Sequence, residues 1–418
     1  MPATNALTDA ASKPADSANP EAVPTFATYR QRIEQKDLAL HQEIDHFLGL
    51  LRVLGTPMID DAQAHFIYHN PFAREVKLAG EFPSSGWGGV AMTRLGETGI
   101  FHLSLALQAP ARIEYKFQVD GQWLADPFCA NRVDNGVGGE NSCLVLGRFD
   151  EPAELEWHAA LPHGNIEEFV LSSRYLKNQR KVYVYLPAQY GEMKGQELPA
   201  LYVHDGGEYL TRARLAIALD NLIHAGEIPP LIVVMVNPVQ RESEYIGNED
   251  YAALVEHELI PRIESSYRAR GHRDSRAVMG ASMGGLIATY LALTRPHLFA
   301  KVAGQSSAFF LNEEKVVALA GALATPVIFY FDVAETEAQF IPAHKRLMPI
   351  LESKQCRCFY QEVPGGHNWT TWRAHLKEIL VFHWGEDKFK RARENRESSV
   401  ATAAPLKQSA KPQPPPGR

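Results

Sequence analysis

The segment RAVMGASMGGLIATYLALTRPHLF, residues 276–299, decides the fold of the larger part of the chain. It places the G-x-S-x-G pattern of Gly280, Ser282 and Gly284 between a short apolar strand and a long apolar helix. Such a sharp turn forces the serine into a strained conformation, and the small residues beside it let strand and helix approach closely. The segment therefore predicts a nucleophile elbow with Ser282 as the nucleophile. The alternative is a structural Ser-Gly turn.

Apolar segments flank the elbow on both sides and alternate with helical stretches. The segments are KVYVYLP (181–187), PALYVHD (199–205), LIVVMVN (231–237), RAVMG (276–280), KVAGQS (301–306), PVIFYFD (326–332) and RCFYQEV (357–363). Continuous apolar strands separated by helices such as YAALVEHELIPRIESSYR (251–268) are typical of a mostly parallel sheet with both faces covered. Together with the elbow, they predict an α/β-hydrolase catalytic domain over residues 160–387.

A serine hydroxyl is a weak nucleophile and needs a base that takes its proton. His367 follows the last of these strands in the glycine-rich loop VPGGHNW (363–369), and the order along the chain in such folds is serine, acid, histidine. We therefore expect His367 to be the general base. The acid should lie at the end of PVIFYFD, where Asp332, Glu335 and Glu337 compete.

Two backbone N–H groups must bind the negative charge that develops on the substrate oxygen. Met283, directly after the nucleophile, supplies one by geometry. The loop His204-Asp205-Gly206-Gly207 after an early strand offers the other from Gly206 or Gly207, because glycine allows close backbone approach. A plain turn at the end of the strand is the alternative for these glycines.

Three side chains near these motifs are expected to contact substrate: Asp205 in the glycine loop, Arg241 in the segment 241–245, and Trp369 beside His367. For Arg241 the alternative is an Arg–Glu pair that braces its own loop. The mechanism that these residues imply needs no metal and no organic cofactor.

The two ends of the chain have a different pattern. Residues 1–24 are rich in Ala, Ser, Pro and Asp and predict a disordered leader, and residues 388–418, basic and then proline-rich, predict a disordered tail. Residues 25–57 predict one amphipathic helix, because apolar side chains recur there at helical spacing; they are Tyr29, Ile33, Leu40, Ile44, Phe47, Leu48 and Leu51. We expect this stripe to pack against the neighbouring domain, and a homodimer contact is the alternative.

Residues 60–149 contain short strands rich in β-branched and aromatic residues, separated by Gly, Pro and Asn turns. The strands are AHFIYHN (64–70), EVKLAGEF (75–82), GIFHLSLAL (99–107), ARIEYKFQVDG (111–121), QWLAD (122–126) and NSCLVLG (141–147). The pattern predicts an immunoglobulin-like β-sandwich. Only about a dozen residues separate it from the catalytic domain, which predicts docking rather than free tethering.

From about residue 180 to residue 385 the chain resembles the putative-esterase (esterase D-like) family and, within it, the enterochelin (ferric enterobactin) esterase group. The matching segments are VYVYLP, YVHDGGEY, HELIPRIESSYR, GASMGGLIATYLALTRPHLFAKVAGQSS and GGHNWTTWR. In that family the triad acid follows a glycine by three residues after the late strand. Ala334 stands where that glycine would be, so the resemblance implies Glu337 as the acid, ahead of Glu335, with Asp332 in a structural contact.

The β-strand region is similar to the early-set modules found before such esterases and to glycogen-binding modules of family 48. The segment EYKFQVDGQW (114–123) carries this resemblance. In glucan-binding relatives the positions of Trp87, Lys116, Trp123 and Asn141 contact sugar, which implies weak glucan binding as one use of the module. Packing of Trp87 and Trp123 against the catalytic domain is the alternative that we favour. In siderophore esterases the module helps to close the active site.

Composition narrows the range of partners. The 418 residues carry a formal net charge of -7, which argues against nucleic acid and anionic membranes, and no apolar run approaches the length of about 20 residues that spans a bilayer. The N-terminus lacks the basic and apolar regions of a secretory signal, so we expect a cytoplasmic protein. The four cysteines are too few for a disulfide scaffold and complete no zinc site, which predicts reduced thiols.

These features predict a serine esterase that hydrolyses a small-molecule carboxylic ester through an acyl-enzyme. The resemblance implies a siderophore lactone as substrate, with iron arriving bound to it. The missing signal sequence favours that substrate over acylated sugars and feruloyl-type esters. Acyl transfer to a sugar uses the same residues and is an alternative. A glucan-binding or scaffolding protein with a vestigial catalytic domain is another, which the intact Ser282 and His367 oppose.

Overall fold

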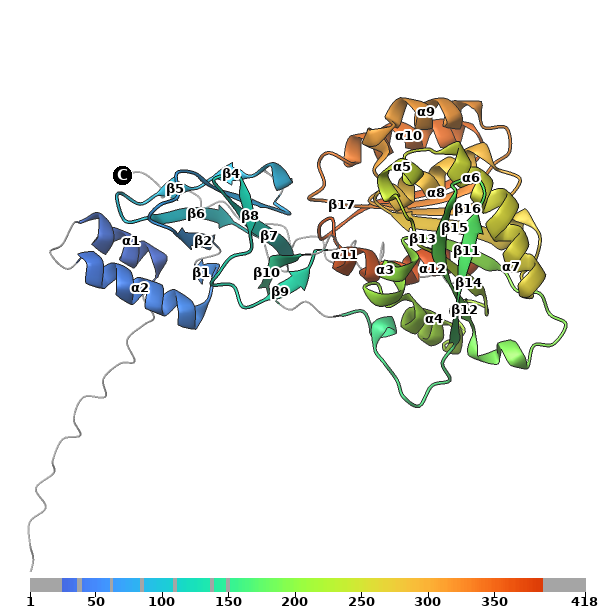
Figure 1. The fold of residues 1–418 in the computed structure, drawn as a ribbon, viewed down its shortest axis with the longest axis horizontal. Helices are drawn as coiled ribbons and strands as arrows, with labels where there is room; N and C mark the ends of the chain where they lie inside the picture. Colours follow the sequence, from blue (N-terminus) through green and yellow to red (C-terminus); the bar gives the residue numbers. More distant parts are fainter. Residues whose placement is uncertain are drawn as a thin grey trace, which may run out of the picture.

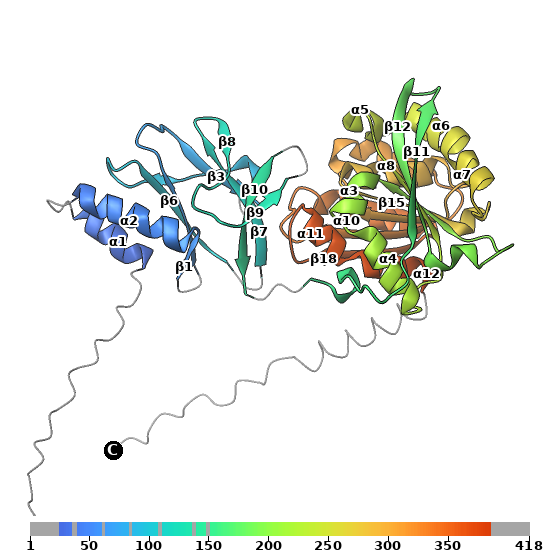
Figure 2. The same cartoon turned by 60° about the horizontal axis from the view of Figure 1, so that its bottom comes forward.

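The computed structural model describes residues 25–35, 40–60, 63–82, 86–107, 111–135, 139–147 and 151–385. The expected leader (1–24) and tail (388–418) lie outside these ranges. Figure 1 shows two bodies, a β-sandwich that carries two N-terminal helices and a larger α/β domain with a central sheet. In Figure 2 the sandwich again lies beside the part of the α/β domain that contains the short helices α3 (Gly206–Thr211) and α11 (Trp369–Ala374).

The N-terminal segment forms two helices, so the expectation of one amphipathic helix over residues 25–57 is wrong. Helix α1 (Phe26–Glu34) and helix α2 (Leu40–Leu54) lie side by side against the sandwich (Figure 1), and residues 36–39 between them lie outside the described ranges. One straight helix of this length would carry part of its apolar stripe away from the sandwich and leave it in water. Two shorter helices bury both halves of the stripe.

Aromatic rings hold the two helices together. Phe26 and Tyr29 of α1 pack on Phe47 of α2, with ring centroids 6.1 and 4.8 Å apart, and all three side chains are buried. The same cluster includes Ile67 and Ile100 of the sandwich, so the stripe packs against the neighbouring domain as expected. The alternative was a homodimer contact through this stripe. The stripe is covered within one chain and offers no apolar surface for such a contact.

Two antiparallel sheets form the sandwich. One has the strand order β1-β2-β6-β5, and the other has the order β4-β3-β7-β10-β9, with β8 beside β7. Phe66, Tyr115 and Phe117 fill the core between the sheets with edge-to-face ring contacts. The strands are β1 (Met58–Asp60), β2 (Gln63–His69), β3 (Val76–Gly80), β4 (Val90–Ala91), β5 (Thr93–Arg94), β6 (Ile100–Ala106), β7 (Ala111–Val119), β8 (Gln122–Leu124), β9 (Arg132–Asp134) and β10 (Glu140–Leu146).

The central sheet of the α/β domain has the order β11-β12-β14-β13-β15-β16-β17-β18. Strands β11 and β12 are antiparallel to their neighbours, and the strands from β14 to β18 run parallel. The edge strand β11 was not expected, because half of its side chains face water and its sequence lacks an apolar run. The strands are β11 (Asn165–Ser173), β12 (Asn178–Leu186), β13 (Ala200–His204), β14 (Ile232–Val236), β15 (Arg276–Ala281), β16 (Lys301–Gln305), β17 (Ile328–Ala334) and β18 (Arg357–Val363).

Helices cover both faces of this sheet, which is why its inner strands are apolar on both sides. One face packs against α3, α4 (Leu215–His224), α11 and α12 (Leu376–Trp384). The other packs against α6 (Glu249–Leu254), α7 (Ile260–Ser266), α8 (Met283–Thr294), α9 (Glu313–Ala322) and α10 (Ile341–Ser353), while the short α5 (Arg241–Tyr245) follows β14. The helix expected over residues 251–268 is α6 and α7 joined by a π-helical turn, Val255–Leu259.

The linker after β10 is fixed on the α/β domain. The side chain of Asn221 in α4 donates hydrogen bonds to the backbone oxygens of Glu154 and Glu156, both at 2.8 Å. The Trp157 ring stacks on His163 with a centroid distance of 3.8 Å. A linker held at these points agrees with docking of the sandwich.

A buried carboxyl lies between the two domains. Glu81 follows β3 and accepts hydrogen bonds from Asn368, which precedes α11. Burial and the nearby Glu114 raise the pKa of the Glu81 carboxyl to about 8. The hydrogen bonds from Asn368 and the positive charge of Arg112 act in the opposite direction but do not cancel that rise.

This pKa predicts how stability changes with pH. Because the pKa of Glu81 is raised in the folded chain, the folded state keeps a proton that the unfolded state releases, and this group weakens folding as pH rises from about 4.5 to about 8. We expect the unfolding temperature of the wild type to fall more over that interval than that of Glu81→Gln, which cannot ionise. Thermal melts across the pH range check this, with the exposed Glu97→Gln as control. Parallel curves for wild type and Glu81→Gln would contradict it.

Candidate active site

Ser282 lies in the turn between β15 and α8 with φ 56° and ψ -121°. A residue in such a sparsely populated region is strained by roughly 1–3 kcal/mol and persists only where its surroundings hold it. The Ser282 N–H donates to the Gln305 carbonyl at 2.8 Å, and the Ala308 N–H donates to the Ser282 carbonyl at 3.0 Å. A side chain at Gly280 would collide with the backbone of Gly284, so strand and helix meet as closely as the G-x-S-x-G pattern predicts.

This turn brings the Ser282 hydroxyl to His367, whose Nε2 lies 2.9 Å from Ser282 Oγ. On the other side of the ring, His367 Nδ1 is hydrogen-bonded to Glu337. The three side chains come from the loops that follow β15, β17 and β18, and the carboxyl ends of parallel strands meet at one edge of the sheet. The imidazole is packed between Phe340 and Trp372, with ring centroids 4.7 and 5.0 Å away.

Of the three carboxylates that competed for the role of acid, Glu337 is the one that contacts His367. Glu335 is exposed, and Asp332 is buried on β17, where it accepts a hydrogen bond from Gln305 at 3.3 Å. Burial raises the pKa of Asp332 to about 7. Burial also acts to raise the pKa of Glu337, but His367 and the hydrogen bonds to the carboxylate outweigh burial and leave this pKa below its usual value. Glu337 is therefore suited to stabilise an imidazolium.

Two side chains that were not expected from the sequence hold Glu337, Ser306 directly and Trp372 through Ser306. Ser306 Oγ donates to Glu337 Oε2 at 2.7 Å, and the indole N–H of Trp372 donates to Ser306 Oγ at 3.0 Å. The backbone N–H of Ala334 donates to the same carboxylate oxygen at 2.6 Å. Ser306 directly follows β16, at the edge of the sheet where the other site residues lie. That position in the sequence was the signal that could have identified Ser306 as a site residue.

The backbone N–H groups predicted to form the oxyanion hole differ in whether they already have a hydrogen-bond partner. Met283 opens α8 directly after Ser282, where a helix leaves its first N–H groups without intrahelical partners. The N–H of Gly207 donates to Asn237 Oδ1 at 2.7 Å, so the expectation that Gly207 supplies a donor is wrong. Gly206 stays a candidate, and its backbone approaches β14 so closely that a side chain there would collide.

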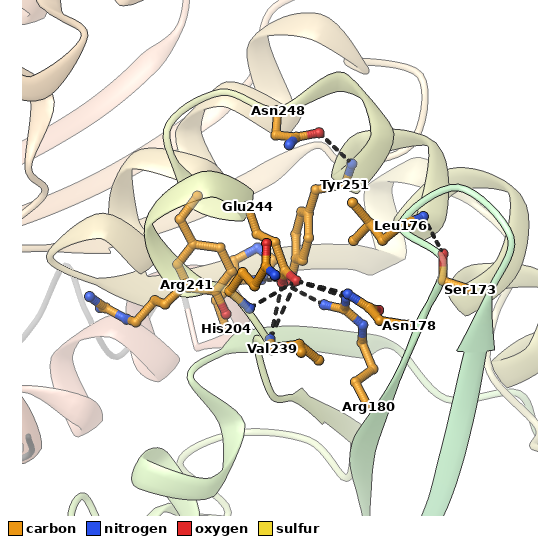
Figure 3. Close-up of polar contacts among 12 residues, drawn as sticks. Ser173, Leu176, Asn178, Arg180, His204, Val239, Arg241, Glu244, Asn248 and Tyr251 are labelled. Carbon is orange, nitrogen blue, oxygen red and sulfur yellow. Dashed lines mark hydrogen bonds and ion pairs between the residues drawn. The ribbon is translucent and has the colours of Figure 1, made fainter. Parts of the chain in front are cut away.

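Asp205 and Arg241, both expected to contact substrate, bind each other. The Arg241 guanidinium donates to the two Asp205 oxygens at 2.8 Å each, and the Asp205 side chain is buried. An Arg–Glu pair does brace the loop, but through another arginine: Arg180 pairs with Glu244 at 2.7 Å, and Glu244 also accepts from the Val239 N–H (Figure 3). Arg241 stays partly exposed and borders the cleft described next.

The site opens into a cleft of about 820 Å³ between the two domains. The α/β domain contributes Ser282, His367 and Trp369 together with Asp205, Glu208, Arg212, Arg214, Arg241 and Arg373, and the sandwich contributes Trp87, Arg112, Glu114, Lys116, Trp123 and Asn141. The expected substrate contact Trp369 packs edge to face on Tyr209 and Trp372. The cleft therefore joins the proposed nucleophile to a wall that belongs to the other domain.

The tryptophans of the sandwich line the cleft, and their packing against the catalytic domain, the alternative that we favoured, stays a prediction. Trp87 and Trp123 are 39% and 46% exposed, their ring centroids are 6.3 Å apart, and both line the cleft. Lys116 lines the same wall. Asn141 also lines the cleft, and its buried side chain donates a hydrogen bond to Glu114 at 2.9 Å.

The chain was compared with known protein families, and residues 173–383 match the family described as putative esterase. The chain belongs to the putative esterase family. Residues 53–130 of this esterase match carbohydrate-binding module 48, the isoamylase N-terminal domain. The expected α/β-hydrolase domain preceded by a β-sandwich is therefore confirmed.

Two curated proteins and one solved structure are similar to this chain. The iron(III) enterobactin esterase of Escherichia coli O6:H1 is 25% identical over 278 residues, which cover 63% of this esterase and 68% of the relative. The endo-1,4-beta-xylanase/feruloyl esterase of Xylanibacter ruminicola is 29% identical over 217 residues, or 48% of this chain and 29% of its own length. The Shigella flexneri enterobactin esterase solved with enterobactin has a TM-score of 0.63 at 22% identity, and covers 79% of this chain and 95% of its own.

Other features of this esterase bear on its chemistry. Within the described ranges, no group of three or more His, Cys, Asp and Glu side chains is placed to hold a metal ion. No helix in the same part of the chain is both long and apolar enough to cross a membrane. All four cysteines are described, and all are free.

The assignment of the acid can be tested by two amide substitutions. We expect Glu337→Gln to lower kcat on the order of 10³- to 10⁴-fold, because an amide cannot stabilise the imidazolium in the same way. Glu335→Gln is the matched control two residues away, and it should keep the wild-type rate. Steady-state kinetics with a p-nitrophenyl ester measure both. Equal rates for the two variants, or a greater loss in Glu335→Gln, would remove Glu337 from this role.

Proposed function

We propose that this esterase is a serine carboxylic-ester hydrolase that works through an acyl-enzyme. The observation that carries the proposal is the hydrogen-bonded chain from Ser282 Oγ through His367 to Glu337, which begins at a strained strand-to-helix turn and borders a cleft. A serine, a base and an orienting acid in this geometry are what nucleophilic catalysis needs.

The geometry suggests the following steps. The Ser282 hydroxyl attacks the ester carbonyl while His367 Nε2, 2.9 Å away, takes its proton. The N–H groups of Met283 and Gly206 bind the carbonyl oxygen as it becomes negative. The imidazolium then gives its proton to the departing alcohol, which leaves an acyl group on Ser282. A water that loses a proton to His367 attacks that acyl group. The imidazolium then returns the proton to Ser282 Oγ as the bond to the acyl group breaks and the acid leaves, while Glu337 stays ionised throughout.

Removing the nucleophile tests this mechanism. We expect Ser282→Ala to lose ester hydrolysis by a factor on the order of 10⁴ or more while the fold stays intact. Turnover of a p-nitrophenyl ester, labelling by a fluorophosphonate and circular dichroism measure the three parts of this statement. Ser265→Ala, at an exposed serine of α7, is the control. Near wild-type turnover by Ser282→Ala, with labelling also unchanged, would refute the mechanism.

We further propose that the substrate is the ester of a catecholate siderophore, bound as its ferric complex in the cytoplasm. Relatives carry the name iron(III) enterobactin esterase, and the cleft has the volume of a small-molecule site, about 300 to 1,000 Å³. A ferric catecholate complex is an anion. Lys116 and Arg214, from different domains, both line the cleft and make no ion pair with the described residues. They support an anionic substrate in spite of the net charge of -7.

A feruloyl-type or acylated-sugar ester, cleaved by water or transferred to a sugar, is the second candidate. It is favoured by the feruloyl esterase relative and by the exposed Trp87 and Trp123, because aromatic rings stack on sugars as well as on phenolic rings. A purely glucan-binding role would not explain the hydrogen bond between Ser282 and His367.

A substitution in the wall of the cleft tests which substrate the site binds. We expect Trp123→Ala to raise KM for a ferric catecholate ester by about three- to tenfold with little change in kcat, because the lost ring stacks on a catechol rather than on the reacting carbonyl. Phe72→Ala, at an exposed aromatic residue of the same domain outside the cleft, is the matched control. Retention of the wild type on an amylose column, with Trp123→Ala eluting freely and fully active, would make the module a carbohydrate anchor instead.

A further inference from the structure

The contact between the two domains reaches the residue next to the proposed general base. Glu81 of the sandwich is buried, and its two carboxylate oxygens accept hydrogen bonds from Asn368 Nδ2 at 2.8 and 2.9 Å. The backbone N–H of Glu114 donates to the same carboxylate at 2.9 Å. Because Asn368 directly follows His367, the sandwich holds the chain one residue from the imidazole.

The Asn368 side chain is held at both ends. Its amide oxygen accepts from the Thr371 N–H at 2.9 Å, which caps the start of α11. With the oxygen committed to the helix, the amide nitrogen points to Glu81. Turning the amide over would place its nitrogen against the Thr371 N–H, so helix α11 fixes one orientation. In that orientation the amide nitrogen faces Glu81.

The loop before the histidine is confined as well. A side chain at Gly366 would collide with the carboxyl of Glu81, and Gly365 has a φ of 126° and lies against Thr371. Thr336 Oγ1 donates to the Gly365 carbonyl at 2.7 Å. The loop is thus held by the end of β17, by α11 and by one residue of the other domain.

The cost of this contact suggests that it does more than fill space. Glu114 lies close enough to Glu81 to raise the pKa of its carboxyl, and burial raises that pKa further. Glu114 itself is paired with Arg112 at 3.0 Å and accepts from Asn141 at 2.9 Å. Burying an acid beside another acid weakens folding. An apolar residue at this position would avoid that loss but could not orient Asn368.

We propose that Glu81 is a positioning residue that acts through Asn368 to place His367, so that full turnover requires the docked sandwich. The inference rests on the serine mechanism proposed above. Proton transfer needs His367 Nε2 within hydrogen-bond reach of Ser282, and a displacement of about 1 Å costs up to about a hundredfold in rate.

The full-length chain provides the test, with kcat and KM for a p-nitrophenyl ester and the rate of fluorophosphonate labelling as readouts. Glu81→Ala removes the acceptor. In assays above pH 8, where the Glu81 carboxyl with its pKa of about 8 has lost its proton, Asn368→Asp sets two carboxylates against each other while keeping the cap on α11. Both should lower kcat and the labelling rate by between about ten- and a hundredfold, with KM within about twofold. Glu97→Ala, at an exposed carboxylate of the same domain, should leave all three values unchanged.

A double substitution keeps the test decisive if either single variant folds poorly. Glu81→Gln combined with Asn368→Asp reverses the donor and acceptor: the amide nitrogen at position 81 donates to the carboxylate at 368, while the amide oxygen at 81 still accepts from the Glu114 N–H. We expect this pair to recover most of the kcat and labelling rate that Asn368→Asp loses. Such coupling is the signature of a direct contact.

Three outcomes would overturn the mechanism or the inference. If Ser282→Ala turns over the ester like the wild type, the proposed mechanism fails and this inference fails with it. If Ser282→Ala is inactive but the folded fractions of Glu81→Ala and Asn368→Asp keep wild-type kcat and labelling rates, the mechanism stands and Glu81 is only structural. Failure of the double substitution to recover activity, when its melting temperature matches the wild type, also overturns the inference.

Discussion

The strained backbone at Ser282 is the constraint from which the geometry of the site follows. The turn at φ 56° exists because β16 accepts the Ser282 N–H through Gln305 and because Gly280 and Gly284 carry no side chains between β15 and α8. Once the serine is fixed there, the remaining site residues must come from strand ends at the same edge of the sheet. Parallel pairing of β16, β17 and β18 supplies those ends, and with them the acid and the histidine.

Three buried acids near the site illustrate how neighbours decide protonation. Glu337 has a lowered pKa because His367, Ser306 and backbone N–H groups outweigh its burial. Asp332 is also buried, but with weaker compensation its pKa rises to about 7. Glu81 is raised to about 8 because burial adds to the repulsion from another acid. Judged by residue type alone, all three acids would have similar pKa values and would be ionised at neutral pH. Only the first environment suits a group that must stay ionised beside an imidazolium.

The sequence predicted the elements that follow a strong local rule. Long apolar strands, the G-x-S-x-G turn and the glycine-rich loop at His367 are signals within a single segment, and the structure contains each of them. Glu337 could not be chosen over Glu335 by local chemistry, because both follow the same strand, and only a resemblance separated them. The roles of Ser306 and Glu81 depend on contacts between distant segments, which the sequence does not reveal. The hydrogen bond from Gly207 to Asn237 is another contact of this kind. The break between α1 and α2 was missed because two helices of one hairpin share the same periodicity as one long helix.

The distribution of charge in the cleft connects these observations. Arg112, Arg241 and Arg373 border it, but each is paired with a carboxylate, on Glu114, Asp205 and Glu151 respectively. Their charges are therefore largely balanced, whereas Lys116 and Arg214 make no ion pair with the described residues. Low-dielectric walls concentrate the field of such cations, so a chain with a net charge of -7 can still present a positive site to a small anion. Because Lys116 belongs to the sandwich and Arg214 to the α/β domain, that field depends on the docked state. The contact that places His367 in the proposed mechanism thus also assembles the positive walls of the cleft.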